Sequence, residues 1–84
     1  MFVIVTYDVD VKRIDRVRKI LRKYLCWVQN SVFEGEITVS NLARCKAEIS
    51  QVIDGEDSVY FYVVRGALQK EVIGVSKNPV DDII

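Results

Sequence analysis

The 84-residue sequence predicts a single α+β domain with the element order strand, helix, strand, strand, helix, strand. Two runs of β-branched and aromatic residues, FVIVTY (2–7) and SVYFYVV (58–64), indicate strands. Two other segments, one beginning near Lys12 and one near Ser40, repeat apolar residues at helical spacing. Half of the residues are apolar, which is enough for one core, and the length leaves no room for a second domain.

The first strand is apolar on both faces, as expected of a central strand that is covered on at least one side. Asp8 to Val11 is expected to form a loop before a helix that starts at Lys12. Asp10 is the expected N-cap, because its acid would lie at the positive end of the helix dipole. The helix would bury one stripe of residues: Ile14, Val17, Ile20, Leu21, Tyr24 and Leu25.

The middle segment WVQNSVFEGEI (27–37) alternates poorly as one strand, because Asn30 and Ser31 interrupt it. One kinked strand and two short strands joined by a tight turn both fit, and the pair is favoured. The second helix is expected to open within 38–41, with Ser40 as its cap, and to end at Asp54-Gly55. Its buried stripe would be Leu42, Cys45, Ile49, Val52 and Ile53.

Beyond the last long strand, Arg65-Gly66 breaks the pattern and VIGV (72–75) is expected to form a short extra strand. Pro79 limits the tail to an extended or edge role. Two β-α-β units predict a ferredoxin-like sandwich at 1–77, followed by a C-terminal tail at 78–84. Both helices then cover one face of an antiparallel sheet, and the other face stays apolar and uncovered. Such a patch predicts self-association through the sheet.

Charge is balanced overall, with 12 basic and 12 acidic residues, but it is unevenly distributed. Residues 1–26 contain seven basic and three acidic residues, whereas residues 27–84 contain five basic and nine acidic ones. The first helix therefore has a local positive field. Its cations suit either a solvated face or the phosphate backbone of a nucleic acid. The candidate nucleic-acid-binding residues are Lys12, Arg13, Arg16, Lys19 and Lys23, with Arg18 and Arg22 flanking them.

The sequence has no histidine and no CxxC motif, which excludes histidine-based catalysis and argues against a tetrahedral zinc site. Cys26 and Cys45 are interpreted as free packing residues, with a disulfide as the alternative. Asp8, at the end of the first strand, is either a turn residue or a ligand of Mg²⁺ or Mn²⁺. Two Asp8 side chains that meet across a dimer axis would make a better site than one. Such a metal could activate water and neutralise a phosphodiester.

Tyr60, Phe61 and Tyr62 invite comparison with the aromatic platform of RNA-recognition sheets. The basic-Gly-aromatic signature of that module is missing, so core or interface packing is favoured. No signal peptide is recognisable, and no apolar run approaches the roughly 18 residues that span a bilayer. We therefore expect a cytoplasmic protein without a membrane partner.

The segments VIVTYDV (3–9), WVQNSVFEGEIT (27–38) and EDSVYFY (56–62) resemble the Cas two family of small CRISPR-associated adaptation proteins. The similarity continues through KNPVDDII (77–84), so it covers nearly the whole chain. The resemblance implies a ferredoxin-like fold and a symmetric homodimer with facing sheets, in which the C-terminal strand crosses to the partner. It also implies that the dimer bridges dimers of the CRISPR integrase (Cas one) and holds a duplex prespacer DNA.

The same resemblance implies a metal-dependent endonuclease that acts on RNA or double-stranded DNA, with Asp8 as catalytic residue and Mg²⁺ ligand. Tyr7, Ser31 and Phe33 would position the substrate or shape the dimer cleft. Many members of the family have arginine where this chain has Trp27, which weakens a catalytic role for a cation there.

Three functions stay open from the sequence. The first is a metal-dependent nuclease. The second is a non-catalytic scaffold that holds the integrase on duplex DNA. The third is a ferredoxin-like regulatory module that binds a small molecule, against which the lack of a Gly-rich anion loop argues.

Overall fold

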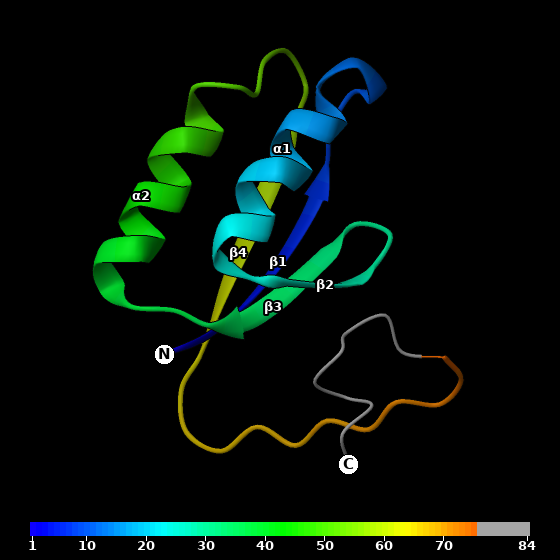
Figure 1. Cartoon of the computed structure of the whole chain (residues 1–84), viewed down its shortest axis with the longest axis vertical. Coiled ribbons are helices and arrows are strands. Elements are labelled where there is room, and N and C mark those ends of the chain that lie inside the picture. Colours follow the sequence, from blue (N-terminus) through cyan, green and yellow to red (C-terminus); the bar gives the residue numbers. More distant parts are fainter. Residues whose placement is uncertain (76–84) are drawn as a thin grey trace.

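The computed structural model describes residues 1–75 and has the predicted element order (Figure 1). The strands are β1 (Phe2–Asp8), β2 (Cys26–Gln29), β3 (Val32–Glu36) and β4 (Ser58–Val64), and the helices are α1 (Val11–Tyr24) and α2 (Val39–Ser50). The preference for two short strands between the helices is confirmed, with Asn30 and Ser31 in the turn.

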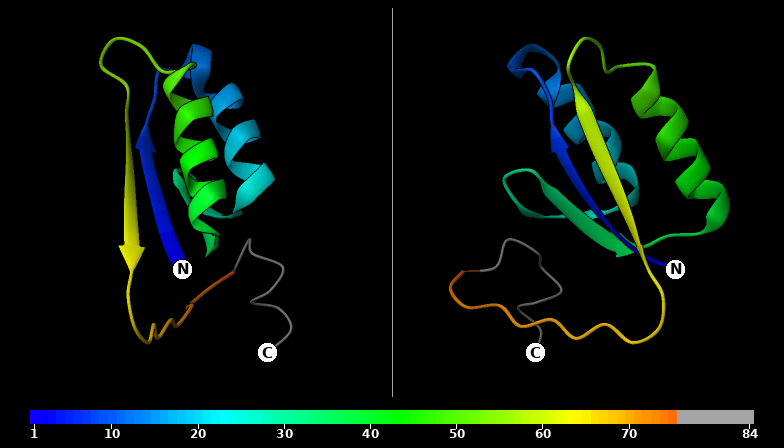
Figure 2. Two further views of the ribbon diagram at one scale, coloured as in Figure 1. Left: turned by 90° about the vertical axis from the view of Figure 1, so that its left-hand side faces the viewer. Right: turned by 180° about the vertical axis from the view of Figure 1, so that it is seen from behind.

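The four strands form one antiparallel sheet in the order β2-β3-β1-β4. β1 is central, as predicted, and pairs with β3 on one side and β4 on the other. Val5 lies opposite Phe33 on β3 and Phe61 on β4. Both helices cover the same face of the sheet (Figure 2). This arrangement is the ferredoxin-like sandwich that the sequence predicts.

The core lies between the sheet and the two helices. β1 and β3 contribute Val3, Val5 and Phe33, none of which retains exposed area. The fully buried residues of the helices are Val17, Leu21, Cys45 and Ile49. Both cysteines are free, as expected, and burial raises the pKa of the Cys45 thiol to about 11. Cys45 therefore acts as a small apolar residue.

The helix caps confirm one prediction and correct another. The carboxylate of Asp10 accepts a hydrogen bond from the backbone N–H of Lys12 at 3.0 Å, so Asp10 is the N-cap of α1. In α2 the cap is Thr38 and not Ser40. The Thr38 hydroxyl accepts from the N–H of Asn41 at 3.1 Å, and the backbone of Thr38 is still extended. Ser40 already lies inside the helix, where its side chain cannot cap the first turn.

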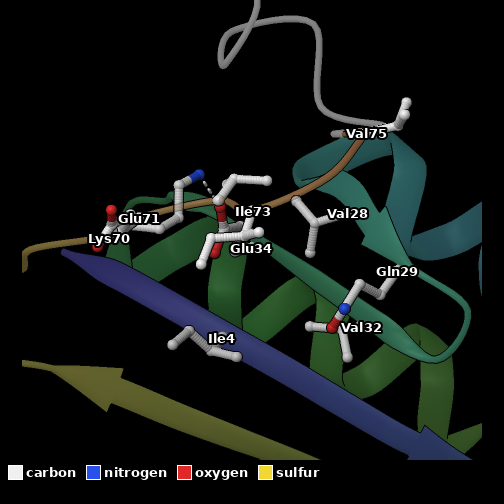
Figure 3. Close-up of a pocket in the computed structure, with 10 residues that line it drawn as sticks. Ile4, Val28, Gln29, Val32, Glu34, Lys70, Glu71, Ile73 and Val75 are labelled. Atoms are coloured by element: carbon white, nitrogen blue, oxygen red, sulfur yellow. Dashed lines mark hydrogen bonds and ion pairs between the residues drawn. The ribbon is translucent and has the colours of Figure 1, made fainter.

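The face of the sheet opposite the helices, here called the open face, is only partly uncovered. Residues 70–75 cross it beside β2 and β3 and enclose a pocket of about 520 Å³ (Figure 3). On the sheet side the pocket is lined by Ile4, Val28 and Val32. Lys70 Nζ reaches the nearly buried Glu34 Oε1 at 2.6 Å. The expected bare face therefore exists at β4, where Tyr60 and Tyr62 are exposed, but not at β2 and β3.

The expected strand at 72–75 is wrong for the chain as described. These residues have no strand pairing, and Gly74 adopts a φ of +102°, which interrupts an extended run. The predicted tail at 78–84 lies outside the described residues, and the domain boundary at 77 stays a prediction. Across residues 1–75, none of the helices combines the length and the apolar character needed to cross a membrane.

Candidate functional site

Asp8 is the last residue of β1 and lies opposite Ser58, the first residue of β4. It is exposed, and strand alternation puts its side chain on the open face with Ile4 and Thr6. A shallow pocket of about 400 Å³ lies beside it and includes Arg13 and Asp57. Within residues 1–75, the Asp8 carboxylate makes no hydrogen bond or ion pair. It is therefore available to a ligand.

The two neighbouring aspartates are already engaged. Asp10 caps α1, as described above. The Asp57 side chain is only 4% exposed and accepts a hydrogen bond from Arg13 Nε at 2.6 Å. Hydrogen bonds from Arg13 and from the backbone N–H groups of Asp10 and Asp54 hold the pKa of the Asp57 carboxyl well below its usual range. Its stabilising contribution is therefore complete above about pH 4 and declines as the pH falls through that lowered pKa.

Asp8 alone provides a limited metal site. No cluster of three or more potential ligand residues that could hold a metal occurs in the described part of the chain. Mg²⁺, however, usually keeps several waters and is held by one or two carboxylates together with phosphate oxygens of a substrate. A single free carboxylate at an exposed strand end fits that role, but it does not form a cage that is complete without substrate or a second subunit.

The expected role of Tyr7, Ser31 and Phe33 in positioning substrate or shaping a dimer cleft stays a prediction, but Tyr7 and Phe33 do not lie on the open face. They lie on the helix side of the sheet, where Phe33 is fully buried and Tyr7 is 5% exposed. The reason is strand alternation, which turns Tyr7 away from the face that carries Asp8. Ser31 is half-buried in the β2–β3 turn, and its carbonyl accepts a hydrogen bond from the Tyr7 N–H at 3.2 Å.

The Tyr7 hydroxyl has a structural function in this arrangement. It donates to the carbonyl of Asn30 at 2.9 Å and accepts a hydrogen bond from Arg18 Nε at 3.0 Å. The same carbonyl accepts from Trp27 Nε1 at 3.3 Å. Tyr7 therefore fastens the β2–β3 turn to β1 and α1, and the sequence alone gave no sign of this network.

The five predicted nucleic-acid-binding residues of α1 fall into two groups. Lys12, Arg16 and Lys19 are exposed and form no ion pair within residues 1–75. Arg13 is bound to Asp57, and Lys23 is hydrogen-bonded to Glu48. Three of the five predicted nucleic-acid-binding residues are thus free to meet a phosphate, and two are paired with carboxylates of the same chain.

Arg18 and Arg22 lie near Trp27 on β2. Their guanidinium carbons are 6.0 and 5.8 Å from the centre of the Trp27 ring. The tryptophan therefore packs on the helix side, against α1 of its own chain. Arg22 is exposed and extends the cationic surface, although it was not among the five candidates.

A family model described as "CRISPR associated protein Cas2" matches residues 1–72. The chain belongs to the Cas2 family. The resemblance seen in the sequence is confirmed, and the interpretation as a small-molecule regulatory module outside this family is wrong.

Individual Cas2 proteins match over nearly their full length. The "CRISPR-associated endoribonuclease Cas2" of Thermococcus kodakarensis is 56% identical over 85 residues, which is 100% of both chains. A second relative, the "CRISPR-associated endoribonuclease Cas2 3" of Thermodesulfovibrio yellowstonii, is 52% identical. The match covers 99% of this chain and 98% of the relative. The solved "Crystal structure of cas2" superimposes with a TM-score of 0.84 at 42% identity, covering 94% of this chain and 92% of that one. Its similarity supports the ferredoxin-like fold.

Proposed function

We propose that this Cas2 protein is a homodimeric, metal-dependent endoribonuclease of CRISPR adaptation, with Asp8 as the catalytic residue that binds Mg²⁺ or Mn²⁺. The observation that carries the proposal is the free carboxylate of Asp8, exposed at the end of β1 while Asp10 and Asp57 are engaged. The names of the relatives, which call them endoribonucleases, support the same activity.

Asp8 and the exposed cations of α1 would have separate roles in the reaction. Asp8 would hold a divalent ion, which would supply an acidified water and neutralise the charge of a phosphodiester. The Asp8 carboxylate provides a ligand for that ion at an edge open to a large substrate. Lys12, Arg16 and Lys19 hold the phosphate backbone along α1, starting four residues after Asp8. The sequence has no histidine to act as a general base, and a bound ion would instead lower the pKa of its own water, which would lose its proton to solvent.

A homodimer would complete the site. The exposed rings of Tyr60 and Tyr62 lie on the same face as Asp8 and give that face an apolar surface to bury. Two open faces packed against each other would bring the two Asp8 side chains toward the symmetry axis. Residues 70–75, which cross part of this face, would then lie within the interface.

The test of the nuclease is the substitution Asp8→Asn, which keeps the shape of the side chain and removes its charge. We expect cleavage of single-stranded RNA in Mg²⁺ to fall about 100-fold or more, because metal-assisted charge stabilisation is worth several kcal/mol. Asp15→Asn is the matched control, since Asp15 is an exposed acid on α1 and should leave the rate unchanged. An Asp8→Asn protein that folds, dimerises and still cleaves at the wild-type rate refutes the proposal.

A second function is favoured by a separate observation, the row of free cations on α1. We propose that the dimer also holds duplex DNA and serves as a scaffold for the CRISPR integrase (Cas one) during spacer acquisition. Lys12, Arg16 and Lys19 provide three phosphate contacts on each protomer.

The triple substitution Lys12→Ala/Arg16→Ala/Lys19→Ala tests this scaffold. We expect weaker duplex binding and a dependence on salt concentration that is shallower by about one unit for each lost phosphate contact. The measurement is fluorescence anisotropy of a labelled duplex at 50 to 200 mM salt, in which binding to phosphates weakens steeply for the wild type. Arg13→Ala/Lys23→Ala is the matched control, because both cations are already paired with carboxylates of the same chain. Equal losses in the two variants contradict the assignment.

A further inference from the structure

The carboxylate of Asp57 joins three separate segments of the chain. Its Oδ1 accepts hydrogen bonds from the backbone N–H of Asp10 at 2.9 Å and from Arg13 Nη2 at 3.2 Å. Its Oδ2 accepts from Arg13 Nε at 2.6 Å and from the backbone N–H of Asp54 at 3.1 Å. Each oxygen thus binds one backbone donor and one guanidinium donor, and the side chain is almost fully buried.

This network involves one residue close to Asp8 in the sequence and one close to the β4 partner of Asp8. Asp57 directly precedes Ser58, which is paired with Asp8 at the last step of the β1–β4 ladder. Asp10, which donates to Asp57, follows Asp8 by two residues. The Asp57 carboxylate therefore links the chain just after Asp8 to the chain just before its partner on β4. A strand end held only by its terminal pair would open locally more easily than one fastened in this way.

The loop before β4 is shaped to present this carboxylate. Gly55 adopts a φ of +57°, which favours glycine, and its N–H donates to Asp54 Oδ1 at 2.7 Å. The N–H of Asp57 donates to the Asp54 carbonyl at 3.0 Å and closes the turn. Arg13 approaches this turn from the first turn of α1, so the end of β1, the start of α1 and the start of β4 form one unit.

We infer that Asp57 and Arg13 are a positioning pair that fixes the Asp8 carboxylate for the reaction. The inference rests on the proposed nuclease function and assigns neither residue to contact with the substrate. Small errors in the position of a reacting group reduce rates strongly, by about 100-fold for a 1 Å displacement. The pair also explains why Arg13, although it belongs to the basic helix, is unavailable to a phosphate.

The test compares Asp57→Asn with Glu56→Gln. Both remove one negative charge from the same loop and from the rim of the same pocket, but only Asp57 bridges the three segments. For Asp57→Asn we expect kcat for RNA cleavage to fall about 10- to 100-fold, with KM changed less than about twofold. Glu56→Gln should stay within about twofold of the wild type in both constants.

A second readout does not need the reaction. Amide hydrogen exchange in the metal-free protein should become at least about tenfold faster at Asp10, whose N–H donates to Asp57, in Asp57→Asn, and stay unchanged at Val3 and Val5. The double variant Arg13→Gln/Asp57→Asn should lose no more activity than the worse single variant, because both substitutions break the same contact. If Asp57→Asn does not fold, Arg13→Lys can replace it in the comparison with Glu56→Gln. Lysine keeps the positive charge but cannot donate to both oxygens of Asp57 in the bidentate arrangement of arginine.

The outcomes separate this inference from the proposed function. If Asp8→Asn abolishes cleavage while Asp57→Asn behaves like Glu56→Gln, the positioning role is refuted and the nuclease stands. If Asp8→Asn keeps the wild-type rate, the nuclease fails, and the exchange rate at Asp10 alone decides whether Asp57 orders this strand end. Unchanged exchange there overturns the inference.

Discussion

The two faces of the same sheet use their side chains in different ways. Under the helices, Val3, Val5 and Phe33 have no exposed area. On the open face, Tyr60 and Tyr62 are 57% and 51% exposed and stack on each other with ring centres 6.3 Å apart. Because side chains alternate between the two faces along each strand, one short sequence supplies both a core and an exposed aromatic surface. The folded chain can thus keep large apolar groups for association without opening its core.

The contrast extends to two adjacent residues of β1. Tyr7 points toward the helices, where its hydroxyl holds the β2–β3 turn through the carbonyl of Asn30. Asp8, one position later, belongs to the open face and has no partner within residues 1–75. Both residues belong to the same sequence motif, yet the structure gives the first a packing role and leaves the second free for chemistry.

The largest effect that separates the two faces should come from Phe33→Ala. The fully buried ring leaves a cavity in the core, so we expect the free energy of unfolding to fall by about 3–5 kcal/mol. Tyr62→Ala on the open face should cost less than about 1 kcal/mol, because half of its ring is already in water. Urea unfolding at low protein concentration, where dimerisation contributes least, measures both. Similar losses for the two substitutions would contradict the division of the sheet into a core face and an interface face.

The sequence predicted what depends on local periodicity. The β-branched and aromatic run FVIVTY and the helical spacing of the apolar residues after Lys12 are properties of a single element, and both predictions are confirmed. The predicted N-cap of α2 was wrong, because Thr38 and Ser40 lie two residues apart and both residue types cap helices well. The direction in which the chain leaves β3 decides between them, and that direction is a tertiary property.

The candidate site was predictable only in part for the same reason. Asp8 was found because it interrupts an apolar strand, which is a local signal. The pair of Arg13 and Asp57 spans 44 residues of sequence, and nothing in either segment indicates the contact. The expected strand at 72–75 failed because a strand requires an edge to pair with, which its own residues do not specify.

Substitutions of the exposed tyrosines should affect the stability of the fold less than Phe33→Ala does, but they should weaken the proposed homodimer. We expect Tyr60→Ser/Tyr62→Ser to raise the dimer dissociation constant at least about 100-fold, because exposed aromatic residues at the centre of an interface commonly contribute 2 kcal/mol or more each. Val11→Ser/Val39→Ser is the matched control, since these two valines are 84% and 71% exposed at the starts of the helices, away from the sheet. Analytical ultracentrifugation over a range of concentrations measures both variants. If the tyrosine variant dimerises as tightly as the control, the two Asp8 side chains are not brought together through this face, and the single carboxylate must act with its own substrate alone.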